Sequence, residues 1–169
     1  LRQVLKLYDP DSSDAKVSNS AHADNIWSFT EDDEGNLYCG VYTIKGNANP
    51  SIYKSTDNGE TWVKKIDFAL AGLVPSYGIH IHCVEWRKWD KCLYTVVGEY
   101  NTIFCSKDRG ETWEDLHITL PKAKSTTLTS TSLGLITTSD DAYNCIFKFF
   151  NVFYVNIIFF AICFFIFVC

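Results

Sequence analysis

Two histidines that alternate along one short stretch have the types and spacing best suited to chemistry. His80 and His82 lie in the sequence Ile-His-Ile-His-Cys, which alternates polar and apolar residues as a β-strand does. Because alternate side chains of a strand share a face, both imidazoles are expected on one face, with Trp86 further along it. Such a pair could bind a metal ion, hydrogen-bond a sugar hydroxyl or transfer a proton.

Structural roles compete with each of these chemical roles. The imidazoles could instead satisfy neighbouring backbone groups, and spacing places no third ligand beside them, so we predict no metal and no cofactor. Glu99 is a second candidate for ligand contact, with a solvated turn carboxylate as its alternative. Trp27, Trp86 and Trp89 could stack on a sugar ring, but packing between elements is the favoured interpretation.

An eight-residue pattern, Ser-x-Asp-x-Gly-x-Thr-Trp, occurs twice and specifies how the strands on either side of it turn. Its Asp can accept hydrogen bonds from amides of its own turn, and its Gly can adopt a positive φ without steric cost. The Thr hydroxyl can reach back to the Asp, and the Trp begins the next strand. The two copies contain Ser55, Asp57, Gly59, Thr61 and Trp62, and Ser106, Asp108, Gly110, Thr112 and Trp113. The pattern predicts a folded clip between two strands, not a reaction centre.

Both octapeptides resemble the Asp-box, or BNR repeat, of sialidase-like β-propellers, and both match it at all five defining positions. The resemblance implies an all-β fold of four-stranded antiparallel blades. In that family the box joins the third and fourth strands of a blade, on the face away from the active site. The resemblance therefore implies a fold and carries over no catalytic residue.

Strand patterns around the boxes divide the chain into blades. Residues 1–148 are predicted to form an incomplete propeller, with blades over about 24–67 and 78–118 and a partial blade over 132–148. Individual strands are expected at 25–30, 37–43, 51–54, 62–66, 79–86, 92–97, 102–105, 113–118 and 133–138, the last following a Ser/Thr-rich stretch at 125–132. The boxes begin 51 residues apart, which suits one blade per repeat. Because closed propellers need roughly four to eight blades, we expect a piece of a longer propeller.

The C-terminal tail, residues 149–169, differs from the rest of the chain because it contains no charged residue. The repeat would begin a third box at position 149, but Phe149, Asn151 and Phe153 stand where Ser, Asp and Gly belong. A helix that crosses ~30 Å of hydrocarbon needs about 20 residues, so the tail is long enough for a helical membrane span. Two interpretations stay open: a genuine anchor that associates with a membrane, and a frame-shifted or intron-derived read-through that replaces the rest of the third blade.

Composition narrows the partners and leaves the compartment open. The net charge is −5, with acidic and basic residues mixed, and no basic patch with interleaved aromatic residues supports nucleic-acid binding. The seven cysteines include no Cys-x-x-Cys pair, which favours buried strand cysteines over a zinc site. Membrane-associated and extracellular locations are both compatible with the sequence.

Two functions from different classes fit these observations. The first is a scaffold that binds a glycoconjugate or a protein, because two intact clips occur without an assembled catalytic set. The alternative is a fragment of a sialidase-like glycoside hydrolase whose catalytic residues lie in missing blades. Sialidases use a Tyr nucleophile, and the family grips its substrate with several arginines, whereas this chain contains only Arg2, Arg87 and Arg109. A third interpretation, a membrane-tethered propeller, depends on the tail.

Overall fold

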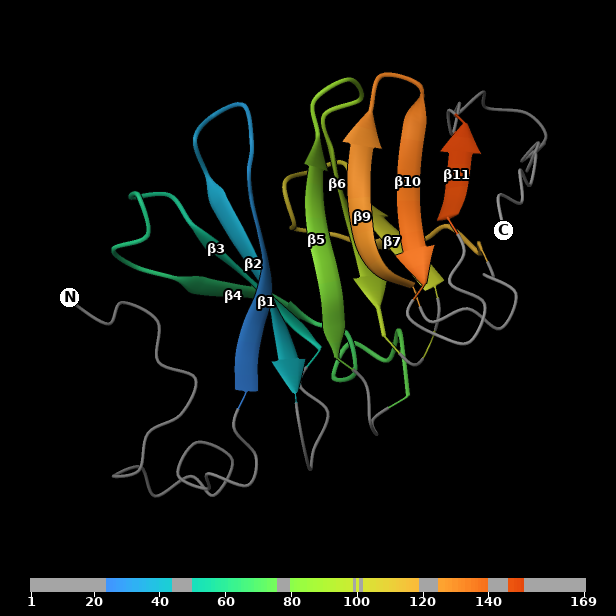
Figure 1. The fold of residues 1–169 in the computed structure, drawn as a ribbon. Helices are drawn as coiled ribbons and strands as arrows, with labels where there is room; N and C mark the ends of the chain where they lie inside the picture. Colours follow the sequence, from blue (N-terminus) through green and yellow to red (C-terminus); the bar gives the residue numbers. More distant parts are fainter. Residues whose placement is uncertain are drawn as a thin grey trace.

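Three antiparallel β-sheets make up the part of the chain that the computed structural model describes, which is residues 24–43, 50–75, 80–98, 100, 102–118, 125–139 and 146–150 (Figure 1). The first sheet contains β1 (Asp24–Glu31), β2 (Leu37–Thr43), β3 (Ser51–Ser55) and β4 (Val63–Asp67). The second contains β5 (Ile81–Arg87), β6 (Cys92–Val97), β7 (Thr102–Ser106) and β8 (Glu114–Asp115). The third contains β9 (Ser125–Thr131), β10 (Gly134–Ser139) and β11 (Ile146–Phe150). Each strand pairs with the next one along the chain, so every sheet is a simple meander.

The predicted strands are confirmed in type and order, with three differences. The strand expected at 113–118 is reduced to β8, Glu114–Asp115. The prediction that the Ser/Thr-rich stretch precedes the third blade is wrong, because this stretch forms β9, the first strand of the third sheet. The third difference is β11, Ile146–Phe150, where no strand is predicted. The polar character of this stretch suggests a loop, but Thr is β-branched and suits a pleated strand. Its hydroxyls also pair across the sheet, with Thr127 Oγ1 2.8 Å from Thr138 Oγ1.

The same irregularity recurs in the first hairpin of each sheet. One extra residue interrupts the register between Ile26 and Ser28 in β1, between Ile81 and Cys83 in β5, and opposite the Thr138–Ser139 step in β9. These are β-bulges, which bend a strand and redirect the side chain of the extra residue. The bulged residues are Trp27, His82 and Thr126. The bulge is therefore part of the structural repeat.

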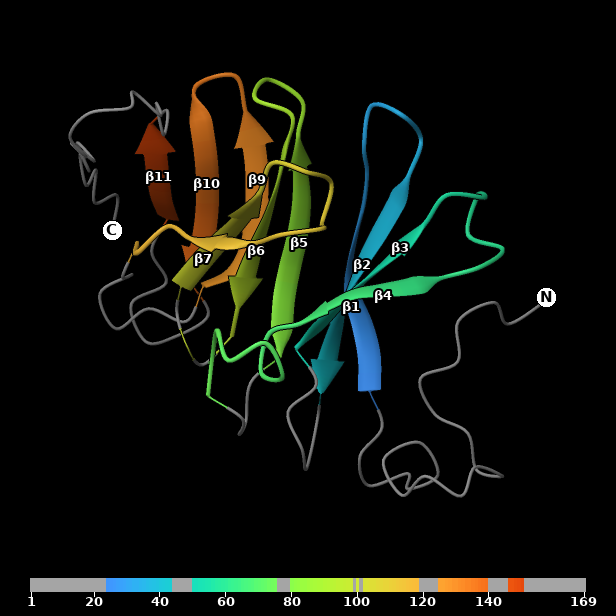
Figure 2. The same cartoon turned by 180° about the vertical axis from the view of Figure 1, so that it is seen from behind.

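The first strands of the three sheets lie side by side, with β5 between β1 and β9 (Figures 1 and 2). Polar side chains of β1 make direct contact with the backbone of β5. Val84 N donates to Ser28 Oγ at 3.0 Å, and Trp86 N donates to Thr30 Oγ1 at 3.1 Å. The sheets therefore succeed one another as repeated units joined through their first strands.

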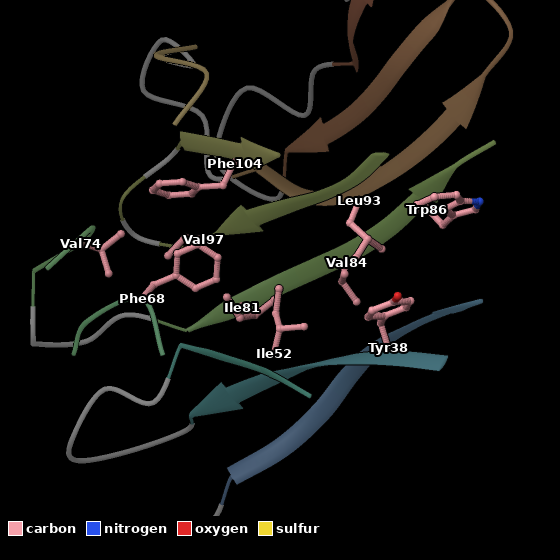
Figure 3. Packing of buried hydrophobic residues seen from close by; sticks show 10 residues of the cluster. All are labelled: Tyr38, Ile52, Phe68, Val74, Ile81, Val84, Trp86, Leu93, Val97 and Phe104. Atoms are coloured by element: carbon pink, nitrogen blue, oxygen red, sulfur yellow. The ribbon is translucent and has the colours of Figure 1, made fainter. Parts of the chain in front are cut away.

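An apolar core fills the space between the first and second sheets (Figure 3). Its buried members are Tyr38, Ile52, Phe68, Val74, Ile81, Val84, Trp86, Leu93, Val97 and Phe104. Phe68, which follows β4, meets Phe104 of β7 with ring centroids 4.9 Å apart. Full burial of each large side chain contributes about 1.5–3 kcal/mol, so this core supplies much of the adhesion between the sheets. A second core of buried residues joins the second sheet to the third: Cys92, Tyr94, Val96, Ile103, Cys105, Leu128 and Leu135.

The beginning of the apolar tail belongs to the third sheet. Phe149 pairs with Leu135 and Phe150 pairs with Gly134, so the helix expected from residue 149 is wrong for these two residues. Their backbone is drawn into a strand because β10 offers a ladder of hydrogen-bond partners. Residues 151–169 lie outside the described part of the chain. Within the described part, no helix is long and apolar enough to cross a membrane.

Candidate functional site

The first octapeptide forms a turn closed by its own side chains. Ser55 Oγ donates to Asp57 Oδ1 at 2.8 Å and accepts from Gly59 N at 2.9 Å. The amide and the hydroxyl of Thr61 donate to the two oxygens of Asp57 at 2.8 and 2.6 Å. Trp62 Nε1 donates to Gly59 O at 3.0 Å. The polar groups of this turn are therefore directed at one another.

The second octapeptide makes the same set of contacts. Gly110 N donates to Ser106 Oγ at 2.7 Å, Thr112 N donates to Asp108 Oδ1 at 2.8 Å, and Trp113 Nε1 donates to Gly110 O at 3.2 Å. The glycine of each turn has a positive φ, 83° at Gly59 and 91° at Gly110, where a side chain would be strained. The two turns are thus one structural element used twice.

Hydrogen bonds to the turn carboxylates lower their pKa. The pKa of Asp57 falls from 3.8 to about 2, chiefly because the Thr61 hydroxyl donates to it and then because of the Thr61 amide. Burial would raise the pKa of Asp108, but hydrogen bonds from Thr112 and Ser106 outweigh burial and lower it. Both carboxylates are therefore ionised at neutral pH and act as acceptors within their own turns.

A pair of buried histidines lies at the opposite ends of the strands from these turns. The first octapeptide begins at Ser55, which pairs with Leu37 at the start of β2. Tyr42, beside the histidines, is near the end of the same strand. His80 and His82 are buried, with Nε2 atoms 2.7 Å apart, and His82 Nδ1 is 2.6 Å from Ser125 O. The pair thus connects the second sheet to the first strand of the third.

The carbonyl partner of His82 indicates where one hydrogen of the pair lies. Ser125 O is a carbonyl that can only accept, so His82 Nδ1 carries a hydrogen. The Nε2 atoms of His82 and His80 share the 2.7 Å contact, and which of them donates depends on the tautomers. One hydrogen bond thus joins the two imidazoles, and a second joins His82 to the third sheet.

An aromatic stack extends from the histidines to the surface. The ring of Tyr42 lies 4.1 Å from the His80 ring, measured between centroids. Trp27 stacks on Tyr42 with centroids 3.6 Å apart and planes 8° from parallel. Trp27 is nevertheless 59% exposed. The site thus holds an indole ring that is largely exposed to solvent in a stack that reaches the buried His80.

A glycine allows the backbone to approach the histidines closely. Gly98 N donates to His80 O at 2.8 Å. A Cβ on Gly98 would lie 2.5 Å from His82 Nε2 and 2.7 Å from His80 Nε2, closer than real contacts permit. The position of the two imidazoles therefore depends on the absence of a side chain at residue 98.

Of the three side chains that the sequence places on one strand face, the structure keeps two together and separates the third. His80 and His82 do lie together, but Trp86 does not share their face and packs in the core between the first two sheets, because the bulge at His82 interrupts the alternation. Packing was favoured for all three tryptophans. It is confirmed for Trp86, whereas Trp27 and Trp89 are 59% and 47% exposed. Glu99 lies outside the described residues. A ligand role for the histidines stays a prediction.

Sequence reasoning named Trp27 only as one of three candidate stacking residues, and it did not place Trp27 or Tyr42 beside the histidines. One signal could have found Trp27: Ile26-Trp27 and Ile81-His82 occupy the same place in the two repeats, directly at the bulge. No comparable signal exists for Tyr42, because only the approach of the second sheet brings it to His80.

The arginines link neighbouring segments of the fold. Arg87 binds Asp90 and donates from Nε to Thr131 O at 3.2 Å, which joins the second sheet to the third. Arg109 contacts Asp32 at 2.6 Å and Asp33 at 2.8 Å, which joins the second octapeptide to the β1–β2 turn of the first sheet. Arg2 lies outside the described residues. The two described arginines are thus engaged in contacts between sheets.

The remaining candidate chemistry is that of metals and thiols. Among the described residues no group of three or more His, Cys, Asp or Glu side chains is arranged to hold a metal ion. Burial raises the pKa of the Cys39 thiol to about 12 and those of the Cys83 and Cys92 thiols to about 11. These three thiols are therefore protonated, and poor nucleophiles, at neutral pH.

Neither a protein-family model nor a curated protein matches this sequence. Solved structures do resemble its fold. YCF48 bound to D1 peptide is 12% identical, with a TM-score of 0.55 over 75% of this chain and 38% of that chain. The nidogen/laminin complex is 16% identical, with a TM-score of 0.55 over 75% of this chain and 43% of that chain. YCF48 from Cyanidioschyzon merolae is 11% identical, with a TM-score of 0.50 over 75% of this chain and 34% of that chain.

These similar structures are β-propeller proteins, and identities this low show a shared fold alone. The chain spans between 34% and 43% of their lengths. The chain therefore has a β-propeller-like fold, and the division of its sheets into blades stays a prediction.

Proposed function

We propose that this chain is a β-propeller module that binds a protein partner by capturing a peptide segment at the exposed face of Trp27. The observation that carries the proposal is the Trp27–Tyr42–His80 stack, which holds a solvent-exposed indole against a half-buried tyrosine and a buried histidine. The two octapeptides, which we infer to be Asp-box clips, lie at the other end of the strands.

A tryptophan held in this way suits protein recognition. Tryptophan is enriched among the few residues that supply most of the energy of protein interfaces. Its side chain has only two rotatable bonds, and stacking on Tyr42 already restricts them, so little conformational entropy remains to be lost on binding. The bulge that turns Trp27 outward also occurs in β5 and β9, so the scaffold presents the residue on a regular structural feature.

Two of the similar structures support a protein ligand in preference to another class. One is YCF48 bound to D1 peptide, and another is the nidogen/laminin complex, so each of them has a protein or peptide partner. Their likeness to this chain extends to the fold only. The chemistry of the Trp27 site is therefore the main support, and these complexes agree with it.

The experiment is selection of peptides from a random phage-displayed library on the immobilised chain, followed by measurement of their dissociation constants by calorimetry. Replacing Trp27 with Ala should raise the dissociation constants of the selected peptides by at least about tenfold, because a central aromatic contact typically contributes about 2 kcal/mol or more to binding. Trp89→Ala is the matched control, because Trp89 is 47% exposed but lies in the β5–β6 turn, at the other end of the strands. That variant should bind as the unmodified chain does.

Three results would contradict the proposal. They are a library with no enriched sequence, a Trp27→Ala variant that binds peptides normally, and equal losses for Trp27→Ala and Trp89→Ala. Binding to an immobilised glycan array tests whether the ligand is a carbohydrate. Glycan binding that depends on Trp27, without peptide binding, would assign the site to a carbohydrate ligand instead.

A further inference from the structure

Equivalent positions in the three sheets differ sharply in burial. The register of the first two strands of each sheet identifies equivalent positions. In each sheet, one residue of the first strand pairs with the residue that lies two positions after the first leucine of the second strand. These pairs are Phe29 with Cys39, Val84 with Thr95, and Leu128 with Thr137. Val84 and Leu128 are 1% and 5% exposed, whereas Phe29 is 56% exposed. This position is therefore buried in the second and third sheets, which each pack on a preceding sheet among the described residues. It is exposed in the first sheet.

A second set of equivalent residues behaves in the same way. Ile81 and Ser125 are fully buried, but Ile26, at the same place in the first sheet, is 41% exposed. Val63 in β4 is a further exposed apolar residue of the first sheet, and Phe29 contacts the ring of Trp62 with centroids 5.9 Å apart. We define Ile26 and Phe29 as the leading face, the counterpart of the surface through which the second sheet packs on the first.

The opposite side of each first strand provides the complementary surface. Ser28 and Thr30 accept hydrogen bonds from the amides of Val84 and Trp86. In the next sheet, Glu85 fills the place of Thr30 and accepts from Ser130 N at 3.0 Å. A polar side chain at this position therefore holds the backbone of the following sheet.

The third sheet carries the same surface without a following sheet among the described residues. Thr127 and Thr129 stand where Ser28 and Thr30 stand in the first sheet, by the same register. Both are exposed, and they point away from the second sheet because Leu128 between them is buried against it. We define Thr127 and Thr129 as the trailing face.

We propose that two copies of this chain associate head to tail, with the leading face of each copy packed on the trailing face of the other. The occupant of the leading face is thus a third sheet of a second copy. Its Thr127 and Thr129 hydroxyls take the role that Ser28 and Thr30 have within one chain. Each chain therefore carries both the leading face and the trailing face. The contact between copies would repeat the packing of the second sheet on the first and of the third sheet on the second.

Head-to-tail contacts between different faces form a ring when the rotation closes and a filament when it does not. The described residues of two copies would bring together six sheets, which lies within the roughly four to eight blades that close a propeller. Association also covers Ile26 and Phe29, whose exposed apolar side chains suit an interface. The inference concerns assembly and is independent of the peptide site proposed at Trp27.

The test is sedimentation velocity of the full 169-residue chain from about 1 to about 100 µM, a range that brackets a micromolar dissociation constant. The unmodified chain should show twice the monomer mass. Phe29→Lys on the leading face and Thr129→Lys on the trailing face should each shift the population to monomer. Leu70→Lys is the matched control, because Leu70 is exposed in the segment after β4, outside both faces. This variant should associate as the unmodified chain does.

Mixing the two monomeric variants separates head-to-tail from symmetric association. The leading face of the Thr129→Lys chain and the trailing face of the Phe29→Lys chain are both intact, so one interface can form and heterodimers should appear. A symmetric interface through one face would leave the variant of the other face associated, so the two variants would not both be monomeric before mixing. Far-ultraviolet circular dichroism and thermal melting of each variant establish that loss of association is not loss of folding.

Three results would overturn the proposal. They are a monomeric unmodified chain over the whole concentration range, an oligomer that persists in a folded Phe29→Lys variant, and a mixture of the two variants that stays monomeric. A Leu70→Lys chain that dissociates as the others do would also overturn it, because apolar exposure in general, and not these faces, would then drive association.

Discussion

At the scale of single residues, Asp57 shows how the turn pattern contributes to stability. Its carboxylate accepts hydrogen bonds from the amide and hydroxyl of Thr61 and from the Ser55 hydroxyl. These bonds favour the ionised form and lower the pKa from 3.8 to about 2. Between these two values the unfolded chain binds the additional proton, so stability rises with pH across this range.

We expect the free energy by which Asp57 stabilises the fold to be fully present above about pH 4 and to be lost as the pH falls through about 2. Denaturant unfolding should therefore give a lower free energy of unfolding for an Asp57→Asn variant than for the unmodified chain at pH 6. The difference between the two free energies should narrow as the pH falls to 2. Thr61→Val removes the largest cause of the low pKa and should reduce the same pH dependence. A difference between the unmodified and Asp57→Asn chains that stays constant with pH would contradict this prediction.

At the scale of elements, close approach between strands of neighbouring sheets decides which residues fit. Gly40 in β2 faces Ile81 in β5, where a Cβ would overlap Ile81 Cγ2 and lie 2.9 Å from Ile81 Cβ. Ile81 is fully buried in the core between the sheets. The absence of a side chain at residue 40 therefore allows the two sheets to pack at this distance.

Gly40→Ala should lower the free energy of unfolding by about 1–3 kcal/mol, as overpacking of a buried site does. The cost should be smaller when Ile81 is replaced by Ala, because Cγ2 is then removed, so the two changes should couple in a double-mutant cycle measured by urea unfolding. Leu128→Ala is the control partner, because Leu128 belongs to the other core. The changes in unfolding free energy caused by Gly40→Ala and Leu128→Ala should simply add. A coupling energy between Gly40→Ala and Leu128→Ala as large as that between Gly40→Ala and Ile81→Ala would be inconsistent with a local clash.

At the scale of the whole molecule, Arg109 fastens the second octapeptide to the β1–β2 turn. Its guanidinium contacts Asp32 at 2.6 Å, Asp33 at 2.8 Å and Glu34 at 2.9 Å, and lies 5.1 Å from the Trp86 ring centroid. Burial alone would raise the pKa of Asp32, but hydrogen bonds from Asn36, Tyr38 and Glu34 outweigh it and lower the pKa to about 2. An ionised carboxylate inside the fold therefore faces a cation from the next sheet.

Arg109→Ala should cost about 2–4 kcal/mol of unfolding free energy, because it leaves the buried carboxylate of Asp32 without its cation. Arg109→Lys keeps the charge but loses the two-pronged geometry, so its cost should be intermediate. Lys107→Ala in the same octapeptide removes a half-exposed ion pair with Glu114 and should cost at most about 1 kcal/mol. Equal costs for Arg109→Ala and Lys107→Ala would show that the contact between the sheets is not the cause.

The amino-acid sequence by itself determined the strands, their order and the turn that recurs. Every side-chain contact within an octapeptide joins residues at most four apart, so residue type and spacing are sufficient to anticipate it. Strand identity follows in the same way from β-branched and aromatic content over a few residues. Composition misled at β9, where hydroxyl-rich residues suggest a loop and the pairing with β10 makes a strand.

Only the tertiary structure decided the candidate site and the faces through which the sheets meet. Ser125 lies 43 residues from His82, and Arg109 lies 77 residues from Asp32, so no local pattern relates them. The bulge that separates Trp86 from the histidines depends on register with a partner strand, and the exposure of Trp27 and Phe29 depends on what another sheet covers. These features arise from contacts distant in sequence, which form when whole sheets pack together.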